Sequence, residues 1–410
     1  MSTTKAESRP VLIAGGGPVG VITALALARR GVPVQVFEAQ AEINDSPRAS
    51  TLHPATLEML TDLGLLEELT ARGLVARTFQ FWDRPSHSLV AEFDHAILAQ
   101  DTTCPYVIQC EQHKIVKMCV DRLAAYPHAK VSFGTPVENV EASADGVSIT
   151  VDYGTKKERV DGCYLVGADG GRSLVRKSMN IDFDGYTFPE RFLVLTTPFD
   201  FGAENGVAFR AYFSDPDEWT NLFKVSGDDG KGRWRAVFPT LPGQTDEDVM
   251  NDAAVEARLQ KFFPKTGRYE VFHRNIYNVH QRVAVRFREG RVFLAGDCAH
   301  VNNPIGGLGL NSGIHDATHL AELIADVYEG KRPTSAFDSY DAIRRPANIE
   351  YVQQQTIANK KRLEERDPAA REANFDALRK TAADPTAHRA FLLRTSLIES
   401  VRKIKAAAAD

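Results

Sequence analysis

Three glycines near the start of the sequence carry its most specific chemical signal. Gly15, Gly17 and Gly20 have the spacing GxGxxG, and Pro18 lies between the second and the third. Glycines in this pattern allow a tight turn, close approach of the backbone to a pyrophosphate, and close packing of a helix on a strand. A helix that begins at such a turn directs free N–H groups and its positive dipole end at phosphates. The pattern predicts dinucleotide binding, and a glycine-rich turn without a ligand is the alternative.

The residues around these glycines predict the strand, helix and strand that such a site requires. An apolar run at 11–14 is typical of a strand buried on both faces, and 21–30 is rich in helix formers and stops at Gly31. A second strand at 34–37 ends in Glu38, whose carboxylate can accept hydrogen bonds from ribose hydroxyls. Because Glu38 would repel a 2′-phosphate, the site favours FAD or NAD over NADP. The central glycines also argue against a membrane span at 11–28, so no membrane insertion is predicted.

Two further motifs place a strand before a turn. A buried-strand pattern at 162–167 leads into Asp169 and Gly170, and another at 292–296 leads into Asp297. A carboxylate at a strand end can bind hydroxyl groups of a cofactor, although a lone aspartate in a turn more often caps that turn. A glycine-rich segment follows the last of these motifs and includes Pro304, Gly307, Gly309, Leu310 and Asn311.

Composition excludes several other classes of protein. The 410 residues include 49 Lys and Arg against 54 Asp and Glu, which gives a net charge of −5 and argues against nucleic-acid binding. The five cysteines form no CxxC pair, so neither a disulfide scaffold nor a bound metal is predicted. Free thiols indicate a reducing compartment, and we expect a cytoplasmic protein.

The three motifs, in this order, resemble those of the single-component flavoprotein aromatic hydroxylases, the p-hydroxybenzoate hydroxylase-like monooxygenases. The match also includes Arg48, Gln109 and Tyr340-x-x-x-Arg344-Arg345-Pro346, and covers about residues 11–346 apart from a variable substrate layer. The resemblance implies an α/β fold: a Rossmann-like FAD-binding domain, an inserted antiparallel β-sheet that binds substrate, and a C-terminal helical segment.

Changes in composition along the chain suggest how these parts alternate. Aromatic residues become frequent and helical periodicity fades after residue 185, as is typical of a sheet layer. We predict FAD-binding parts at 10–77, 101–184 and 289–346, substrate-layer strands at 78–100, a substrate-binding β-layer at 185–288, and C-terminal helices at 347–410.

The resemblance also implies the chemistry. NADH or NADPH would reduce FAD, O₂ would add at the flavin C4a position, and the resulting hydroperoxide would hydroxylate a small aromatic substrate, either phenolic or N-heteroaromatic. The protein would act as a monomer or homodimer.

Roles for individual residues follow from the same resemblance. Arg48 matches an arginine that contacts the flavin and its phosphates, Gln109 a glutamine near the adenosine, and Pro304 a proline beside the site of oxygen attachment. We expect Asp297 to bind the ribityl chain and His300 to stabilise its loop. The expected cofactor-binding set is Gly15, Gly17, Pro18, Gly20, Glu38, Arg48, Gln109, Asp169, Gly170, Asp297, Pro304, Gly307, Gly309, Leu310 and Asn311.

Catalytic and substrate-binding residues are harder to select, because aromatic residues in a sheet are mostly core. The catalytic candidates are Pro304, Arg48, His53 and Tyr212, and the substrate-binding candidates are Tyr212, Phe223, Trp234 and Phe238.

Other flavoprotein functions stay open. An epoxidase or N-hydroxylase acting on a non-aromatic natural-product intermediate would share the fold and the cofactor, as would a flavin-dependent reductase. A flavoprotein without enzymatic activity is a further alternative. A flavin-dependent halogenase would carry a WxWxIP stretch, which the sequence lacks.

Overall fold

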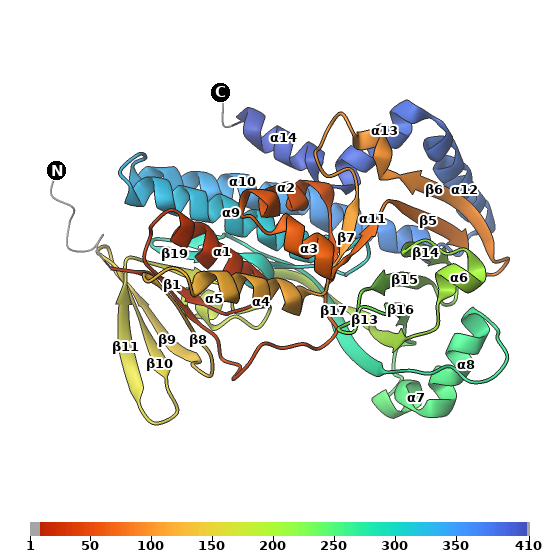
Figure 1. The fold of residues 1–410 in the computed structure, drawn as a ribbon, viewed down its shortest axis with the longest axis horizontal. Helices are drawn as coiled ribbons and strands as arrows, with labels where there is room; N and C mark the ends of the chain where they lie inside the picture. Colours follow the sequence, from red (N-terminus) through yellow and green to blue (C-terminus); the bar gives the residue numbers. More distant parts are fainter. Residues whose placement is uncertain (1–8, 408–410) are drawn as a thin grey trace.

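The computed structural model describes residues 9–407, in which two large sheets are joined and covered by helices (Figure 1). The first sheet has six strands, and all neighbours in it are parallel except the first pair. Their order is β18 (Arg288–Glu289), β19 (Val292–Leu294), β12 (Tyr164–Gly167), β1 (Val11–Ala14), β2 (Val34–Phe37) and β8 (Ala129–Ser132). Every residue of β1, β12 and β19 is buried, which explains their uninterrupted apolar sequences.

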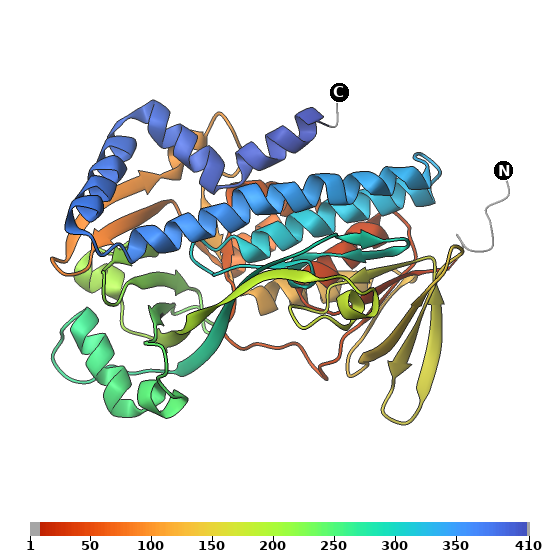
Figure 2. The same cartoon turned by 180° about the vertical axis from the view of Figure 1, so that it is seen from behind.

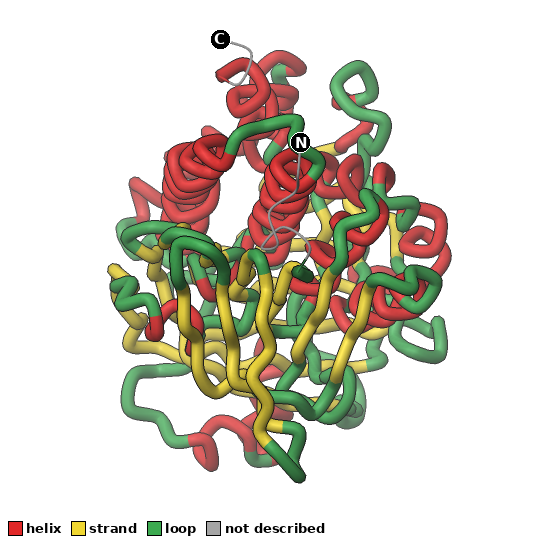
Figure 3. The backbone as a smooth tube through the Cα atoms, turned by 90° about the vertical axis from the view of Figure 1, so that its left-hand side faces the viewer, coloured by secondary structure: helices red, strands yellow, loops and turns green. Residues whose placement is uncertain are grey.

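Helices cover this sheet and complete its core. α1 (Pro18–Arg29) follows β1 and packs against α4 (Gln112–Leu123) and α9 (Gly309–Tyr328). Figure 3 shows helices above the strands. The apolar side chains of these strands and helices form one continuous hydrophobic cluster, so the glycine turn between β1 and α1 rests on a rigid base.

Two small sheets and three short helices attach to this domain. A meander of β9 (Val137–Ala142), β10 (Val147–Asp152) and β11 (Lys157–Gly162) projects beside it (Figure 1). A three-stranded sheet has the order β3 (Thr51–Leu52), β7 (Val107–Gln109) and β4 (Leu74–Ala76). The helices are α2 (Pro54–Asp62), α3 (Leu66–Arg72) and α5 (Leu174–Ser178).

The second large sheet has eight strands and draws on separate parts of the sequence. Its order is β20 (His300–Val301), β17 (His273–Ala284), β13 (Phe183–Thr197), β16 (Arg233–Pro239), β15 (Thr220–Val225), β14 (Arg210–Ser214), β5 (Thr78–Asp83) and β6 (Ser88–Asp94). Its strand pairs are antiparallel except β14 with β5. Strands from 78–100 and from 185–288 therefore lie in one sheet.

This second sheet is covered on both faces. One face packs against α6 (Phe201–Asn205), α7 (Asp246–Met250) and α8 (Asp252–Phe262) around a cluster rich in phenylalanine. The other face forms a separate cluster with the C-terminal helices. Successive residues of a strand point to opposite faces of the sheet, so they pack into different hydrophobic clusters.

The C-terminal helices run from the first domain onto the second sheet, where they arch over its strands (Figure 2). Asp101 fixes them there, because its carboxylate accepts hydrogen bonds from Arg389 Nε and Arg402 Nη2, both at 2.8 Å. The helices are α10 (Asp338–Asn348), the π-helical turn η4 (Ile349–Gln353), α11 (Gln354–Leu363), α12 (Pro368–Ala383), α13 (Pro385–Thr395) and α14 (Ile398–Ala407).

The predicted fold class is confirmed: an α/β domain with a mainly parallel sheet carries a mainly antiparallel sheet and ends in helices. None of the helices between residues 9 and 407 has the length and apolarity needed to cross a membrane. All five cysteines are buried and unpaired.

Candidate active site

The turn after β1 requires glycine at two positions. Gly15 has a φ of +105°, and a Cβ atom there would lie 2.3 Å from the carbonyl oxygen of Ala168, just after β12. A Cβ atom on Gly20 would lie 2.0 Å from the carbonyl oxygen of Gly15. Gly17 differs, because its φ is −68° and a Cβ atom there would meet nothing within 4 Å. Gly15 and Gly20 let strand and helix meet, whereas Gly17 keeps an open space in front of the helix.

That open space belongs to a cavity of about 430 Å³ at the start of α1. No side chain caps the first turn of α1, so its first N–H groups remain available to an acceptor. The carboxylate of Glu38 is fixed by hydrogen bonds from the backbone N–H groups of Gly16 at 2.6 Å and Gln40 at 2.8 Å. Seven of the expected cofactor-binding residues line the cavity: Gly15, Gly17, Pro18, Glu38, Arg48, Asp169 and Gly170.

Asp169 caps the helix that follows it. Its carboxylate accepts hydrogen bonds from the hydroxyl of Ser173 at 2.5 Å and from the N–H groups of Leu174 at 2.7 Å and Val175 at 3.1 Å, at the start of α5. Burial raises the pKa of this carboxyl, and the hydrogen bonds oppose the shift. The structure thus shows the common capping role of a turn aspartate, and contact with a cofactor would be an addition to it.

Asp297 differs from Asp169 because its carboxylate is unpaired. It lies in the short helix η2 (Gly296–Cys298) after β19, is exposed, and accepts no hydrogen bond from any residue between 9 and 407. The surrounding protein atoms raise the pKa of this carboxyl, while the charges of His300 and Arg48 oppose the shift. Arg48, whose charge acts on this carboxylate, also lines the large cavity. The Asp297 carboxylate is therefore free to accept hydrogen bonds from a ligand.

A buried ion network supports the turn that carries Asp297. Asp316 on α9 accepts hydrogen bonds from Gly296 N–H at 3.0 Å, His300 Nε2 at 2.6 Å and Arg344 Nε at 2.7 Å. Burial by itself would raise the pKa of Asp316, but the charges of Arg344 and His300 and these hydrogen bonds lower it to about 2. His300 therefore holds the loop, and the ionised Asp316 fixes the backbone beside Asp297.

A second glycine turn precedes α9. Gly306 and Gly307 have φ values of +110° and +66°, and Gly307 N–H donates to the carbonyl of Pro304 at 3.0 Å. Pro304 is exposed at the start of this turn. α9 begins at Gly309 without a side-chain cap, so its first N–H groups, including that of Leu310, can bind an acceptor.

Asn311 and His53 hold this second turn in place. The Asn311 amide donates to the carbonyls of Thr51 at 2.8 Å and Gly307 at 2.6 Å, and its Oδ1 accepts from His53 N–H at 2.8 Å. Burial, with the charge of Arg210, keeps the pKa of His53 well below its usual value, so the neutral ring donates from Nε2 to the Gly306 carbonyl at 2.9 Å. The side chains of Asn311 and His53 therefore position the second glycine turn through contacts within the protein.

Gln109 lies beside the second glycine turn. Its Oε1 accepts hydrogen bonds from the hydroxyls of Ser50 at 3.3 Å and Thr51 at 3.0 Å. A Cβ atom on Gly307 would lie 2.8 Å from Cβ of the same Thr51. The Nε2 of Gln109 is buried without a partner among residues 9–407. Gln109 does not line the cavity that contains Glu38, where the resemblance would place the adenosine.

The structure places the four substrate-binding candidates in different surroundings. Trp234 and Phe238 on β16 face α6 and α8 and pack with aromatic rings there, and their role in substrate binding stays a prediction. Phe223 is half-buried on the opposite face, and it lines neither the cavity at the start of α1 nor the cavity that contains Tyr212. Tyr212 does line a cavity. Since both faces of the sheet are covered, the burial pattern of β16 gives no sign of which residues face the pocket.

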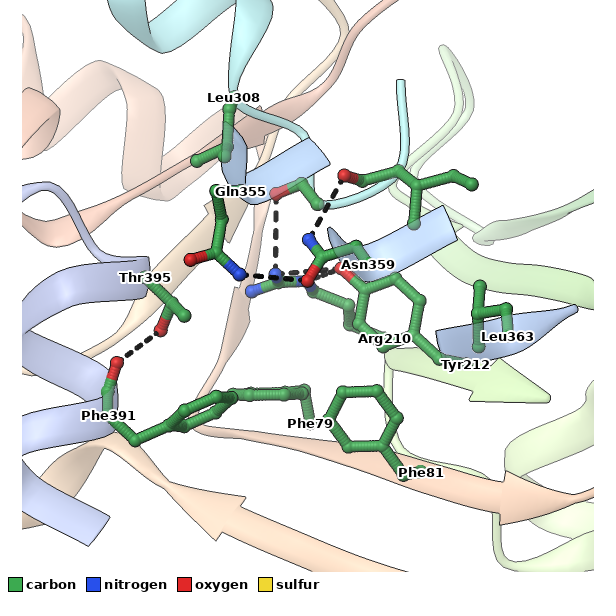
Figure 4. A pocket seen from close by; sticks show the side chains of 12 residues that line it. Phe79, Phe81, Arg210, Tyr212, Leu308, Gln355, Asn359, Leu363, Phe391 and Thr395 are labelled. Carbon is green, nitrogen blue, oxygen red and sulfur yellow. Dashed lines mark hydrogen bonds between the residues drawn. The ribbon is translucent and has the colours of Figure 1, made fainter. Parts of the chain in front are cut away.

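A smaller cavity lies between the second sheet, the second glycine turn and the C-terminal helices (Figure 4). Its volume is about 20 Å³, enough for about one water molecule, so side chains must move before an aromatic ring enters. We call it the aromatic pocket. It is lined by Phe79, Phe81, Arg210, Tyr212, Ile305, Gly306, Leu308, Gln355, Asn359, Leu363, Phe391 and Thr395.

Reasoning from the sequence missed most of the residues that line the aromatic pocket. For some of them, however, the alternation of side chains along a strand indicates a shared face. Arg210 is two positions from Tyr212 on a strand, which places both on one face. Phe79 and Phe81 alternate in the same way in β5. Nothing local distinguishes Asn359, because its helix is brought to the pocket only by tertiary packing.

Comparison with known proteins identifies the class to which this fold and site belong. Residues 8–355 match the family model described as an FAD binding domain. The para-nitrophenol 4-monooxygenase of Pseudomonas sp. (strain WBC-3) is 33% identical over 402 residues, 96% of this chain and 97% of that protein. The 6-hydroxy-3-succinoylpyridine 3-monooxygenase HspB of Pseudomonas putida (strain DSM 28022 / S16) is 34% identical over 87% of this chain and 90% of that protein.

A solved structure gives the same result. The crystal structure of p-nitrophenol 4-monooxygenase PnpA from Pseudomonas putida DLL-E4 superposes with a TM-score of 0.89 at 32% identity, covering 94% of this chain and 96% of that one. The chain therefore belongs to the FAD-dependent aromatic hydroxylase family. It is a flavin-dependent monooxygenase, as the three motifs indicate.

Proposed function

We propose that this protein hydroxylates a small phenolic or N-heteroaromatic ring in the aromatic pocket, in the cytoplasm, with O₂ and with NADH or NADPH as electron donor. The observation that carries the proposal is that aromatic side chains of β5 and β14 meet the second glycine turn in one cavity. The names of two relatives, which act on a nitrophenol and on a hydroxypyridine, support a substrate of this size and type.

Three features of the structure fit bound FAD. Gly17 leaves space in front of α1, Asp297 has an unpaired carboxylate, and Gln109 has a buried donor without an acceptor. We assign the pyrophosphate to the start of α1, the ribose to Glu38, the ribityl chain to Asp297, and the flavin ring to the turn before α9. Gln109 belongs with the ring in this assignment, because it contacts Thr51 beside that turn. Bound FAD would supply the redox chemistry that activates O₂.

The chain's own residues position the ring and exclude water. Phe79 and Phe81 offer apolar surfaces to the substrate ring, and Leu308 places the second glycine turn against the pocket. Leu363 and Phe391 close the pocket from the C-terminal helices. A dry pocket protects a reactive oxygen species from water and strengthens polar contacts inside. The hydroxyl of Tyr212, on the sheet face of the pocket, can hold a proton near the substrate.

The test is to purify the protein with FAD and to screen phenols and hydroxypyridines for stimulated oxidation of NADH and NADPH. Each stimulating compound is then examined by mass spectrometry for a product that has gained one oxygen atom from isotopically labelled O₂. Oxidation of the nicotinamide that yields only hydrogen peroxide with every compound would contradict the proposal.

Replacing Asp297 by alanine is expected to weaken FAD binding about 10- to 100-fold, the value of one charge-assisted hydrogen bond. The dissociation constant is measured by titrating apoprotein with FAD and following flavin fluorescence. Asp376→Ala, at an exposed site on α12, removes the same charge and should leave FAD affinity unchanged. Equal affinity in the Asp297→Ala protein and in the wild type would refute the placement of the ribityl chain.

A further inference from the structure

Buried amide side chains link the loop before the second glycine turn to the C-terminal helices. Gln281 on β17, Asn303 in the loop and Gln353 in the π-helical turn η4 are all buried. The Gln281 Oε1 accepts hydrogen bonds from the backbone N–H of Asn303 at 3.0 Å and from its Nδ2 at 3.2 Å. The Gln281 Nε2 donates to Gln353 Oε1 at 2.5 Å and to the Thr356 hydroxyl at 3.1 Å. We call these four side chains the amide network.

Backbone groups fix the direction of every amide in this network. The oxygen and the NH₂ group of an amide have nearly the same shape, so their hydrogen-bond partners decide which way each side chain points. Gln281 presents its oxygen to the Asn303 N–H. Asn303 Oδ1 accepts from the Ile305 N–H at 3.2 Å, and Gln353 Nε2 donates to the Val301 carbonyl at 3.2 Å. Because each partner allows only one orientation, the network has a single arrangement and holds one conformation of the chain around it.

The network surrounds Pro304, where the second glycine turn begins. Proline has no N–H, so hydrogen bonds to its neighbours must hold it in place. The residue before it, Asn303, is bound by Gln281, and the Ile305 carbonyl after it accepts from Asn359 Nδ2 at 3.3 Å. Ile305 and Asn359 both line the aromatic pocket (Figure 4). The hydrogen bonds on both sides of Pro304 therefore fix the part of the pocket that borders the turn.

The π-helical turn brings the network to the helix that lines the pocket. In η4 the N–H of Gln354 donates to the carbonyl of Ile349, five residues back, a geometry that is rare and frequent at functional sites. The Thr356 hydroxyl donates to the carbonyls of Val352 at 2.9 Å and Gln353 at 3.1 Å. α11 begins directly after η4 and carries three residues of the pocket, Gln355, Asn359 and Leu363. The amide network thus sets the position of α11 relative to the second glycine turn.

We propose that Gln281 is a positioning residue for oxygenation: by joining Asn303 to Gln353, it keeps the second glycine turn and α11 in the arrangement that transfers oxygen to the substrate. This inference rests on the proposed function, because it assigns the flavin ring to that turn. A displacement of about 1 Å can cost about 100-fold in a step that depends on geometry, and a loosened pocket admits water.

The partition of O₂ between two products reports this positioning. In the productive reaction, NAD(P)H gives up a hydride, a proton is taken from solution, and O₂ supplies one oxygen atom to the product and one to water. When the arrangement is lost, the same two electrons and two protons convert O₂ to hydrogen peroxide, and the substrate is unchanged. The ratio of hydroxylated product to oxidised nicotinamide therefore measures how well the two parts of the pocket are aligned.

Two replacements of Gln281 separate positioning from stability. Gln281→Met has a similar length but accepts no comparable hydrogen bond, so the Asn303 N–H loses its partner. Gln281→Glu keeps that acceptor, and rotation of the Gln353 amide and the Thr356 hydroxyl directs donors at its second oxygen. Product per oxidised nicotinamide should fall at least about 3-fold in Gln281→Met and stay within about two-fold of the wild type in Gln281→Glu. Because Gln281→Glu buries a charge and also loses stability to urea, a role in folding alone would not spare its product yield.

Two further measurements do not depend on turnover. Hydrogen–deuterium exchange of the apoprotein, followed by mass spectrometry of residues 300–307, should be at least about 5-fold faster in Gln281→Met than in the wild type, because the Asn303 N–H is freed. Titration of the FAD-loaded protein with 4-nitrophenol in the absence of NAD(P)H, followed by flavin absorbance, should show binding at least about 3-fold weaker. Gln281→Glu should resemble the wild type in both measurements.

Gln260→Met is the matched control. Gln260 on α8 also accepts from a backbone N–H, that of Lys265 at 2.9 Å, and donates to a backbone carbonyl, that of Gly267 at 2.8 Å. Because α8 packs on the face of the second sheet away from the C-terminal helices, this variant should match the wild type in product yield, exchange at 300–307 and binding of 4-nitrophenol.

Three results would overturn the inference. They are unchanged exchange at 300–307 in Gln281→Met, an unchanged product yield in that variant, and an equal loss of product yield in Gln281→Glu. If Gln281→Met fails to fold, Gln353→Met breaks the network from its other end and is measured instead. A wild-type protein that oxygenates no compound would refute the proposed function, and exchange at 300–307 would still decide whether Gln281 holds the turn.

Discussion

The Gly15→Ala protein is expected to lose both stability and FAD. Its new Cβ atom would lie 2.3 Å from a backbone carbonyl oxygen at a φ of +105°, so the chain must move where strand, turn and helix meet. Overpacking and an unfavourable backbone conformation together are expected to cost about 3 kcal/mol or more of the free energy of unfolding. Urea unfolding of the apoprotein, followed by circular dichroism, measures the loss, and the flavin absorbance of the purified protein measures FAD content.

Gly17→Ala is the matched control and separates folding from binding. Its φ of −68° suits alanine and its Cβ atom meets no protein atom within 4 Å, so the apoprotein should retain the wild-type stability within about 0.5 kcal/mol. The methyl group would occupy the space assigned to the pyrophosphate and should weaken FAD binding at least about 10-fold. Full FAD affinity in Gly17→Ala would show that the pyrophosphate does not approach this residue.

Replacing Asp316 by asparagine is expected to reduce the free energy of unfolding by about 3–5 kcal/mol at pH 7, because it leaves Arg344 buried without its counter-charge. The pKa of Asp316 is lowered to about 2, below the ordinary value of 3.8 that applies in the unfolded chain. Its stabilising effect is therefore fully present above about pH 4 and is lost as the pH falls toward 2. The difference in the free energy of unfolding between wild type and variant should be constant from pH 8 to about 4. Below pH 4 this difference should become smaller.

Asp326→Asn is the control for this experiment. Asp326 pairs with two arginines, but the side chains of Arg30 and Arg332 are 33% and 50% exposed, so each of these pairs should contribute less than about 1 kcal/mol. Urea unfolding at a series of pH values measures both variants. If Asp316→Asn lost only a small amount of unfolding free energy, and the same amount at every pH, the network beneath Asp297 would not hold the turn.

The nucleotide-binding domain could be predicted because its signals are local. The spacing of Gly15 and Gly20 predicts the turn, since only glycine permits the backbone contacts found there. The same is true of Glu38, which follows its strand directly. Asp169 shows the limit of such reasoning. The motif predicts a contact with the cofactor, whereas the Asp169 carboxylate caps α5 in the structure.

The aromatic pocket could not be predicted because distant segments assemble it. Trp234 and Phe238 are aromatic residues of the expected sheet, but only tertiary packing decides that they face α8. Asn359 and Thr395 reach the pocket because Asp101 and the strands of the second sheet hold the C-terminal helices there. Alternation along a strand tells which residues share a face, so Arg210 could have been found from Tyr212.

The placement of α13 over the aromatic pocket also sets an order of events during synthesis. Phe391 on α13 stacks with Phe79 on β5, and their ring centres are 6.3 Å apart, although the two residues lie near opposite ends of the chain. Both glycine turns are complete once Asn311 has left the ribosome, well before Pro385 is made. Because domains fold as they emerge, we expect a nascent chain to bind FAD before α13 covers the aromatic pocket. A chain that ends between Asn311 and Pro385 is expected to bind FAD and therefore to be yellow. Its flavin site would be open to water.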